Sequence, residues 1–460
     1  MRFNKMYWLP ICAVIAAVIG MTAPSCSSKG GTAQLSDTVN VVTLYGPASY
    51  FEYKDTSMGY DYELMEAVAQ NNGFTVNWIV VNSLDEAIAM VDSDKALIIA
   101  SEVPQTEEYN RLVRLCGPKN EIEHVLVQPP GDTVIVDINQ LAGQTVYVEK
   151  DSKSEKALEK VNKDIGGAIN IRPVDADSLA TEDMLAAVAR GDLHLAIVDS
   201  ETARLNKTYY PDLAITLAIS EPETMRWAVK KDNANLAKVI DTWFAEPVNV
   251  PRQHEIIKKY FESLKNHPVS GASFDRQFKN GYASPYDHLY KEHTTESVWD
   301  WRLLAAQGYT ESKFDSTARS WAGATGVMQI MPKTARDFGL AKSEMTIPSR
   351  SIETAVKILD AYDEIMASQV RDPIERQKFV MAAYNAGPGH VLDAIRLAKK
   401  YGYDHQKWDD NVEKAMLMKM NRKYYRDPVV RHGYSRGRET VDYVNRIWSY
   451  YDDVVQKIPA

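Results

Sequence analysis

The sequence is poor in cysteine, with three in 460 residues. Cys12 and Cys26 lie near the start, so Cys116 is the one cysteine of the long remainder and no disulfide framework can form there. We expect Cys116 to be a small buried hydrophobe. The nine histidines form no HExxH motif and no CxxC pair occurs, so the sequence predicts no metal site. The segments GATG and GPGH lack the context of a phosphate-binding loop, and no cofactor is predicted.

An excess of positive charge is also absent. The chain has 53 Lys and Arg against 62 Asp and Glu, a formal net charge of −9, which argues against a nucleic-acid partner. With 45% hydrophobic and 25% charged residues, the composition is that of a globular protein. A chain of 460 residues predicts two or three domains.

The first residues differ from the rest. Arg2 and Lys5 precede an apolar run over residues 7–23, a pattern typical of a signal peptide, which we assign to residues 1–25. Cys26 stands where a lipoprotein signal places the cysteine that is acylated, and an ordinary secretory cut nearby is the alternative. We expect an exported, periplasm-facing chain with a lipid anchor in the outer membrane, joined by a flexible tether over residues 26–38.

Two regions of different pattern follow the tether. Strand and helix patterns alternate over residues 39–265, with a helix expected over 60–73, closed by Gly73, and another capped by Ser83. This alternation predicts an α/β domain with mostly parallel strands. Residues 266–281 are rich in Gly, Ser and Pro and predict a linker, and residues 282–460 predict an all-α domain.

The α/β region resembles the periplasmic type 3 solute-binding family. The segments GYDYELMEAVAQNNGFTVNWIVVNSLDEAIAMVDSDKALIIASEVPQTEE and LAAVARGDLHLAIVDSETA carry the resemblance. It implies two lobes that close on a small ligand by a hinge motion. The ligand-site candidates are Asp61, Tyr109, Arg111 and Asp199.

One departure from this family concerns the ligand. Tyr109 stands where the family usually has an arginine that grips an α-carboxylate, and a phenol cannot replace a guanidinium. Arg111 could compensate only if the loop shifts. Asp199 matches the acid that the family uses against an α-amine, and the alternative is that it caps backbone N–H groups. We therefore expect an amino-acid-like ligand with an amine and an extended, uncharged or masked carboxyl end, such as a cell-wall peptide.

In the helical region the chemistry centres on one carboxylate. Leu304, Gly308 and Glu311 share a helix face by their spacing, with no cationic partner at that spacing. Desolvation raises a carboxyl pKa and keeps the group protonated, as a general acid for a glycosidic oxygen must be. The plain alternative is a surface glutamate or a cap.

Three segments, ESKFDSTARSWAGATGVMQIMPKTARDFGL, MAAYNAGPGHV and RGRETVDYVNRI, occur in the order found in the soluble lytic transglycosylase family. The resemblance implies a lysozyme-like fold in which Glu311 performs both proton transfers on peptidoglycan glycan strands and leaves a 1,6-anhydromuramoyl end. It also implies a set of substrate-contacting residues: Ser320, Met328, Gln329, Tyr384, Asn385 and Tyr443, the last bonded to Glu311. The two regions in this order resemble the architecture of the membrane-bound lytic murein transglycosylase F group, which implies modulation by a ligand of the first domain.

Two other functions stay open at this point. A muramidase would use water, and Asp315 is the close candidate for its base, although it more simply caps the helix end. A non-catalytic receptor would only dock on peptidoglycan. Glu439 is interpreted as a structural partner in helix packing.

Overall fold

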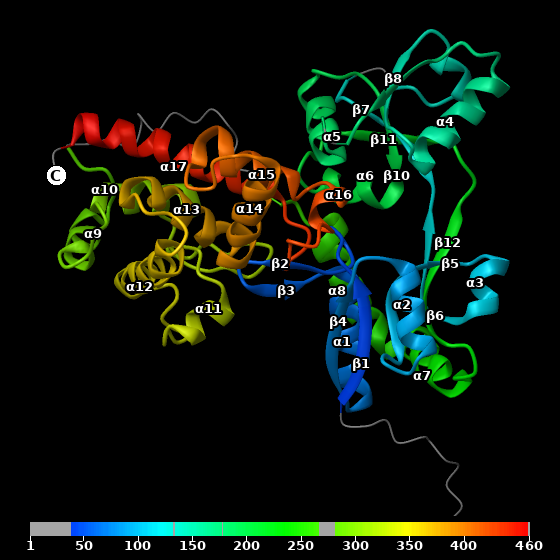
Figure 1. The fold of residues 1–460 in the computed structure, drawn as a ribbon, viewed down its shortest axis with the longest axis horizontal. Coiled ribbons are helices and arrows are strands. Elements are labelled where there is room, and N and C mark those ends of the chain that lie inside the picture. The colour runs from blue at the N-terminus through cyan, green and yellow to red at the C-terminus, as the bar shows by residue number, and fades with distance from the viewer. Residues whose placement is uncertain (1–37, 132–133, 177, 266–280, 459–460) are drawn as a thin grey trace, which may run out of the picture. The chain divides into compact units, whose positions relative to one another are not determined.

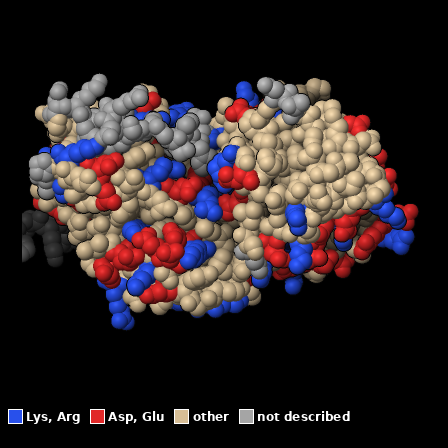
Figure 2. Space-filling model, turned by 90° about the horizontal axis from the view of Figure 1, so that it is seen from above, with Lys and Arg blue, Asp and Glu red and all other residues tan. Residues whose placement is uncertain are grey.

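The computed structural model in Figure 1 describes residues 38–131, 134–176, 178–265 and 281–458. The expected signal peptide, Cys26 and nearly all of the expected tether and linker lie outside the described residues. Residues 36–460 form one compact unit. In the part of the chain that is described, no helix has the length and apolar character needed to cross a membrane. The face in Figure 2 carries Lys and Arg side chains interspersed with Asp and Glu.

The first lobe of the α/β region is built on a five-stranded sheet with the strand order β4-β1-β5-β12-β6. Its strands are β1 (Thr38–Leu44), β4 (Thr75–Val81), β5 (Ile98–Pro104), β6 (Val113–Ile122) and β12 (Glu223–Lys230). Its helices are α1 (Tyr60–Asn72), α2 (Leu84–Asp92), α3 (Glu107–Leu112), α7 (Ala234–Ala245) and α8 (Val250–Ile257). The expected helix ends are confirmed, because Gly73 adopts φ 74° after α1 and the Ser83 side chain accepts from the backbone N–H of Glu86 at the start of α2.

The second lobe has its own five-stranded sheet, with the order β11-β7-β10-β8-β9. Its strands are β7 (His124–Gln128), β8 (Thr145–Glu149), β9 (Asn170–Val174), β10 (Ala196–Asp199) and β11 (Ala214–Ala218). Its helices are α4 (Lys153–Asp164), α5 (Thr181–Arg190) and α6 (Ser200–Lys207). The chain crosses between the lobes at residues 122–124 and again at 219–223. This two-lobed α/β architecture is the one expected.

The expectation of mostly parallel strands was wrong. In each sheet two pairings are parallel and two are antiparallel. In the first sheet β12, which returns from the second lobe, pairs antiparallel with both β5 and β6. The local strand–helix alternation cannot reveal the direction of a strand that enters the sheet from another lobe.

The carboxy-terminal region is helical, as expected. Its helices are α9 (Asp287–Thr294), α10 (Trp301–Ser312), α11 (Pro332–Asp337), α12 (Pro348–Ala367), α13 (Pro373–Ala386), α14 (Pro388–Tyr401), α15 (Glu413–Met418), α16 (Arg422–Tyr425) and α17 (Gly437–Lys457). Helices α10, α13 and α17 pack against a common core that includes Leu304, Phe379 and Ile447, all fully buried. Burial of this apolar surface is what holds the short helices together.

A two-stranded hairpin joins the two regions. Strands β2 (Phe51–Tyr53) and β3 (Thr56–Met58) belong by sequence to the first lobe, and Figure 1 shows them reaching from it to the helical region. The tip residues Lys54 and Asp55 have φ values of 48° and 57°. Two positive φ values in a two-residue turn match the twist of a hairpin, but residues other than glycine and asparagine adopt them at a cost of about 1 kcal/mol or more each. Such a tip persists only where other contacts fix it.

Candidate active site

Glu311 lies in the last turn of α10, where the helix passes through the core. The helix starts at the cap Asp300 and ends at Lys313, whose φ is 53°. Gly308, one turn before Glu311, is a glycine for a packing reason: a Cβ there would lie 2.0 Å from the hydroxyl oxygen of Tyr290. The group that approaches this glycine closely is therefore the hydroxyl of Tyr290, a buried tyrosine of α9.

The Glu311 carboxylate is buried and has two partners. The Tyr443 hydroxyl, from α17, donates to Oε1 at 2.8 Å. The Lys54 ammonium lies 3.3 Å from Oε1 and 3.4 Å from Oε2. The side chains of Glu311 and Lys54 are 7% and 8% exposed. Burial raises the pKa of Glu311, and the charge of Lys54 and the hydrogen bond from Tyr443 act against that rise.

The sequence shows no cationic partner for Glu311 at the helical spacing, and in the structure the cation comes from outside this helix. Lys54 lies 257 residues earlier in the chain, at the tip of the hairpin. Its ammonium also stands 5.6 Å from the ring centre of Tyr384. The helical spacing around Glu311 could not reveal a partner that arrives from another domain.

Three of the other expected substrate residues make contacts with backbone carbonyls or pack in the core of the helical region. The Tyr384 hydroxyl donates to the Met328 carbonyl at 2.8 Å, and the Met328 side chain is fully buried. The Gln329 amide donates to the carbonyls of Ala318 and Gly326, at a backbone φ of 46°. These contacts hold the loop between α10 and α11 in place.

Ser320 and Asn385 also make structural contacts in this state. The Ser320 hydroxyl accepts from the backbone N–H of Ala324 at 3.0 Å. The Asn385 side-chain oxygen accepts from the Thr440 hydroxyl at 2.8 Å. Asn385 also lines the small cavity described below.

Two further carboxylates were considered beside Glu311. Asp315 is exposed and accepts from the backbone N–H and the hydroxyl of Thr317, which lower its pKa. It therefore forms a turn after α10 and does not cap the helix itself. Glu439, on the first turn of α17, accepts from the Tyr53 hydroxyl at 3.3 Å.

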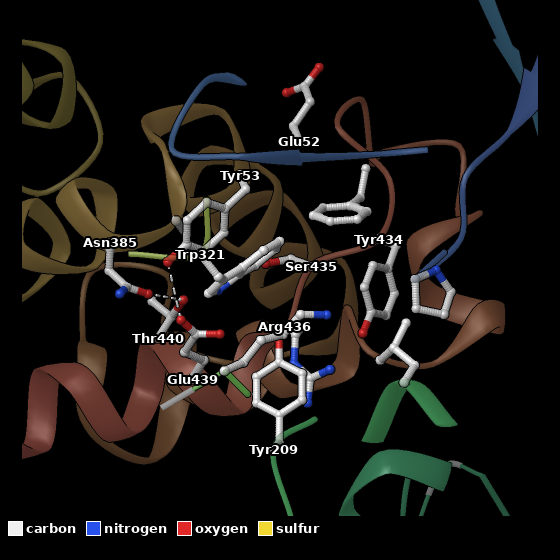
Figure 3. Close-up of a pocket in the computed structure, with 15 residues that line it drawn as sticks. Glu52, Tyr53, Tyr209, Trp321, Asn385, Tyr434, Ser435, Arg436, Glu439 and Thr440 are labelled. Atoms are coloured by element: carbon white, nitrogen blue, oxygen red, sulfur yellow. Dashed lines mark hydrogen bonds between the residues drawn. The ribbon is translucent and has the colours of Figure 1, made fainter. Parts of the chain in front are cut away.

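The hairpin fills the space beside Glu311. Figure 3 shows Tyr53 lying over Trp321 and pointing its hydroxyl at Glu439. The ring centres of Tyr53 and Trp321 are 5.9 Å apart. The cavity that remains holds about 30 Å³, roughly the volume of one water molecule, and is lined from both regions. A sugar chain has no room in this cavity.

The hairpin is held along both edges. The backbone N–H of Lys54 donates to the carbonyl of Ala386 at 3.3 Å, and the Tyr362 hydroxyl donates to Asp55 at 3.1 Å. His432 pairs with the Glu52 carboxylate at 2.7 Å, which raises the pKa of this histidine. These contacts fix the strained tip in the cleft.

The second lobe also contacts the helical region, at the start of α17 and at the residue before it. The Arg438 guanidinium pairs with both oxygens of Asp183 at 3.0 and 3.1 Å. The Arg436 guanidinium stacks 3.6 Å from the ring centre of Tyr209. Both lobes therefore contact the domain that carries Glu311.

The four expected ligand residues of the α/β region lie in different settings. Asp199 and Tyr109 line a larger cavity between the lobes. Asp199 also caps α6, because it accepts from the backbone N–H and the hydroxyl of Thr202. Asp61 is buried, is not among the residues that line the cavity, and accepts from the Trp227 indole at 2.8 Å. Arg111 is exposed and pairs with Glu107, away from the cavity.

The sequence reading missed Lys54 and Trp321. The segment FEYKDTSM offered a signal, because two short runs rich in aromatic and β-branched residues flank a two-residue turn. Nothing in it shows where the turn inserts. In the described ranges, no group of three or more His, Cys, Asp and Glu side chains is placed to hold a metal ion, and Cys116 is free and buried.

Comparison with known proteins identifies both regions. Residues 38–263 match the model of the bacterial extracellular solute-binding proteins, family 3, and residues 288–407 match that of the transglycosylase SLT domain. The chain thus combines a solute-binding-protein-like domain with a transglycosylase domain, which places it in a class of enzymes.

Curated relatives match over most of the chain. The membrane-bound lytic murein transglycosylase F of Desulfosudis oleivorans is 30% identical over 91% of this chain and 90% of its own length. That of Aeromonas hydrophila is 30% identical over 91% of this chain and 82% of its own length. Among solved structures, the L-cystine solute receptor of Neisseria gonorrhoeae in its unliganded open conformation is 20% identical over 49% of this chain and 93% of its own, with a TM-score of 0.42. The chain belongs to the membrane-bound lytic murein transglycosylase F family.

The hydrogen bond from Tyr443 stabilises the charged form of Glu311. We expect Tyr443→Phe to raise the pKa of Glu311 further and to lower the free energy of unfolding by about 1 kcal/mol. A carboxyl-selective NMR titration measures the first effect, with the Glu311 signal assigned by its loss in Glu311→Gln. Tyr451→Phe is the matched control, because Tyr451 lies on the same helix and donates to Asp300 instead. A Glu311 pKa that is unchanged or lower in Tyr443→Phe would contradict the assignment.

Proposed function

We propose that this chain is a peptidoglycan lytic transglycosylase that cleaves the β-1,4 bond between N-acetylmuramic acid and N-acetylglucosamine without consuming water. The observation that carries the proposal is Glu311, a single buried carboxyl whose pKa is raised by burial and which Tyr443 holds in place. A raised pKa favours the protonated form of the carboxyl, which can deliver its proton to a glycosidic oxygen.

The reaction needs one group for both proton transfers. Glu311 gives its proton to the glycosidic oxygen as the bond from that oxygen to C1 of the muramoyl sugar breaks. The acetamido oxygen of the same sugar stabilises the cationic C1. The Glu311 carboxylate then takes the proton of the C6 hydroxyl, and O6 bonds to C1 to close the 1,6-anhydro ring. Glu311 ends as it began, and both electron pairs are accounted for.

A hydrolytic muramidase is the first alternative. It requires a base that activates water on the other face of the sugar, about 6.5–9.5 Å from the acid. Asp315 is exposed and engaged by Thr317, and Glu439 is engaged by Tyr53. Neither setting favours a base for water. A receptor that only docks on peptidoglycan, the second alternative, has no use for a buried acid.

The reaction and its acid can be tested together. Purified peptidoglycan is digested with residues 27–460 or with the Glu311→Gln variant, and the products are analysed by mass spectrometry. We expect 1,6-anhydromuramoyl products from the wild type and a loss of at least about 1,000-fold in Glu311→Gln, because the general acid alone contributes about 10²–10⁴-fold and here also acts as the base. Reducing-end products would identify a muramidase. The absence of cleavage by either protein, even in the presence of a ligand that opens the cleft, would favour the receptor.

We also propose that the hairpin holds the enzyme shut. Lys54 stabilises the charged form of Glu311 and so opposes the protonated form that a general acid needs. Tyr53 covers Trp321 in the same cleft. Substrate can enter only when the hairpin leaves, and a ligand of the two-lobed domain can drive that movement if it favours the open state.

The hairpin proposal is tested by removing its charge. Lys54→Met keeps the apolar stem of the side chain and removes its charge. We expect this variant to turn over peptidoglycan about tenfold faster than the wild type without any added ligand, which corresponds to about 1.4 kcal/mol. The reason is that loss of one partner of a buried ion pair destabilises the closed state of the hairpin. Lys119→Met is the matched control, since Lys119 forms an exposed pair with Glu121 in the same domain. A Lys54→Met enzyme that is as slow as the wild type, or slower, would contradict the proposal.

We propose finally that the chain is exported and anchored through an acyl chain on Cys26, in the outer membrane. The basic start and apolar run before Cys26 support this, as does the word membrane-bound in the names of the relatives. Cells given labelled palmitate should label the wild type and not Cys26→Ser. Cys116→Ser, at the buried cysteine, should retain the label. Label that persists in Cys26→Ser would show that the acyl chain is not attached to Cys26.

A further inference from the structure

A buried amide on α10 lies one turn before Glu311. Gln307 is fully buried, and every residue of the helix from Leu303 to Tyr309 is buried with it. The other side chains of this stretch are aliphatic or aromatic, apart from one glycine. A primary amide in such a setting has lost its contacts with water and is unfavourable unless hydrogen bonds replace them.

The one hydrogen bond that Gln307 makes among the described residues is to the tyrosine that holds Glu311. The Nε2 atom of Gln307 donates to the Tyr443 hydroxyl oxygen at 3.2 Å. The same hydroxyl donates its proton to Oε1 of Glu311 at 2.8 Å. Because α10 and α17 pack against each other, the three groups form a chain of hydrogen bonds from amide to phenol to carboxyl.

The oxygen of this amide is not satisfied. The Oε1 atom of Gln307 is shielded from solvent and has no hydrogen-bond partner among the described residues. An unpaired buried acceptor destabilises a fold, and an apolar side chain of similar size would fill the same space without that penalty. Packing alone therefore does not explain why position 307 carries an amide.

The hydrogen bond from Gln307 fixes the direction in which Tyr443 donates. A hydroxyl proton can rotate about its oxygen, and an N–H group that donates to this oxygen excludes the proton from its own side. The Tyr443 proton is thereby directed to Glu311. The bond from Gln307 also polarises the O–H group and strengthens its bond to the carboxyl. Burial and the charge of Glu311 raise the pKa of Tyr443, and the bond from Gln307 acts against this rise.

This chain of hydrogen bonds makes the two carboxyl oxygens of Glu311 unequal. Oε1 accepts the proton of Tyr443, so a protonated Glu311 carries its own proton on Oε2. When Glu311 loses that proton, the bond from Tyr443 becomes stronger, because a charged acceptor forms the stronger hydrogen bond. The phenol proton stays on Tyr443, since the pKa of this hydroxyl lies far above that of a carboxyl.

We propose that Gln307 is a positioning residue for the reaction. Acting through Tyr443, it keeps Oε1 of Glu311 as an acceptor and leaves Oε2 as the oxygen that exchanges protons with the substrate. Oε2 gives its proton to the glycosidic oxygen and later takes the proton of the C6 hydroxyl, so the proton balance of the reaction is unchanged. The hydrogen bonds can be measured without substrate, and only the role of Oε2 rests on the proposed function.

The test is a cycle of variants of residues 27–460, followed by a carboxyl-selective NMR titration of Glu311. Gln307→Met keeps the length of the side chain and removes both its donor and its unpaired acceptor. We expect it to raise the pKa of Glu311 by about 0.5–1, because the bond from Tyr443 becomes weaker and less directed. The same substitution in a Tyr443→Phe background should change this pKa no further, since Gln307 acts through that hydroxyl.

Thermal unfolding separates a positioning role from a packing role. We expect Gln307→Met to unfold at the same temperature as the wild type or at a higher one, because an apolar group replaces a half-satisfied buried amide. A residue that only supported the core would instead lower the unfolding temperature and leave the pKa of Glu311 unchanged.

The consequence for the reaction is measured as a pH profile of kcat/KM on peptidoglycan. Both enzymes carry Lys54→Met, so that the ion pair of the hairpin does not enter the comparison. The decline at high pH reports loss of the proton of the general acid, and we expect Gln307→Met to move this decline to higher pH. Turnover at the optimum should fall by about threefold or more, because Glu311 becomes a weaker acid.

Trp301→Phe is the control. Trp301 begins the same helix, at the end away from Glu311, and its indole Nε1 is also buried without a hydrogen-bond partner among the described residues. This variant removes a comparable unpaired group from α10, and the pKa of Glu311 should stay as in the wild type.

Three results would overturn the proposal. The first is an unchanged Glu311 pKa in a folded Gln307→Met variant. The second is a lower pKa, which would show that the amide competes with Glu311 for the phenol proton. The third is failure of both Gln307→Met and Gln307→Leu to fold, since the core would then require the amide. A raised pKa in an enzyme that forms no anhydromuramoyl product would confirm the hydrogen bonds and contradict the proposed function instead.

Discussion

The buried ion pair between Lys54 and Glu311 is the interaction on which the rest of this structure depends. A carboxylate as shielded as Glu311 is unfavourable unless a cation or strong donors compensate it. Tyr443 supplies one donor from within the helical region, and the cation comes from the other domain. The ammonium group reaches it only because a hairpin tip with two positive φ values projects from the first lobe. The pair, the strained turn and the contact between domains are thus parts of one arrangement.

This arrangement brings two opposing effects to the carboxyl group of Glu311. In the reaction proposed above, Glu311 must be a proton donor with a sugar beside it, whereas Lys54 stabilises its carboxylate form and Tyr53 covers Trp321 in the same cleft. The hairpin therefore has to move away from Glu311 before the proposed reaction can begin.

Much of the site could be predicted from the sequence. The three motif segments of the helical region place Glu311, Tyr384 and Tyr443 in one cleft, and the hydrogen bond from Tyr443 to Glu311 is present. Helix ends such as Ser83 and Gly73 were also predicted, because capping depends on residues within one turn. The directions of the strands were not, because β12 enters the first sheet after the chain has passed through the second lobe.

The sequence alone determined the local structure, the class of each domain and the carboxyl group that we propose as the catalytic acid. These follow from periodicity, caps and short motifs, whose physical basis lies within a few residues of chain. Only the tertiary structure decided that Lys54 faces Glu311, that Tyr53 covers Trp321 and that Arg438 pairs with Asp183 of the second lobe. Each of these contacts depends on which surfaces meet after folding. Contacts between residues that are far apart in the sequence produce no periodic pattern along the chain from which they could be predicted.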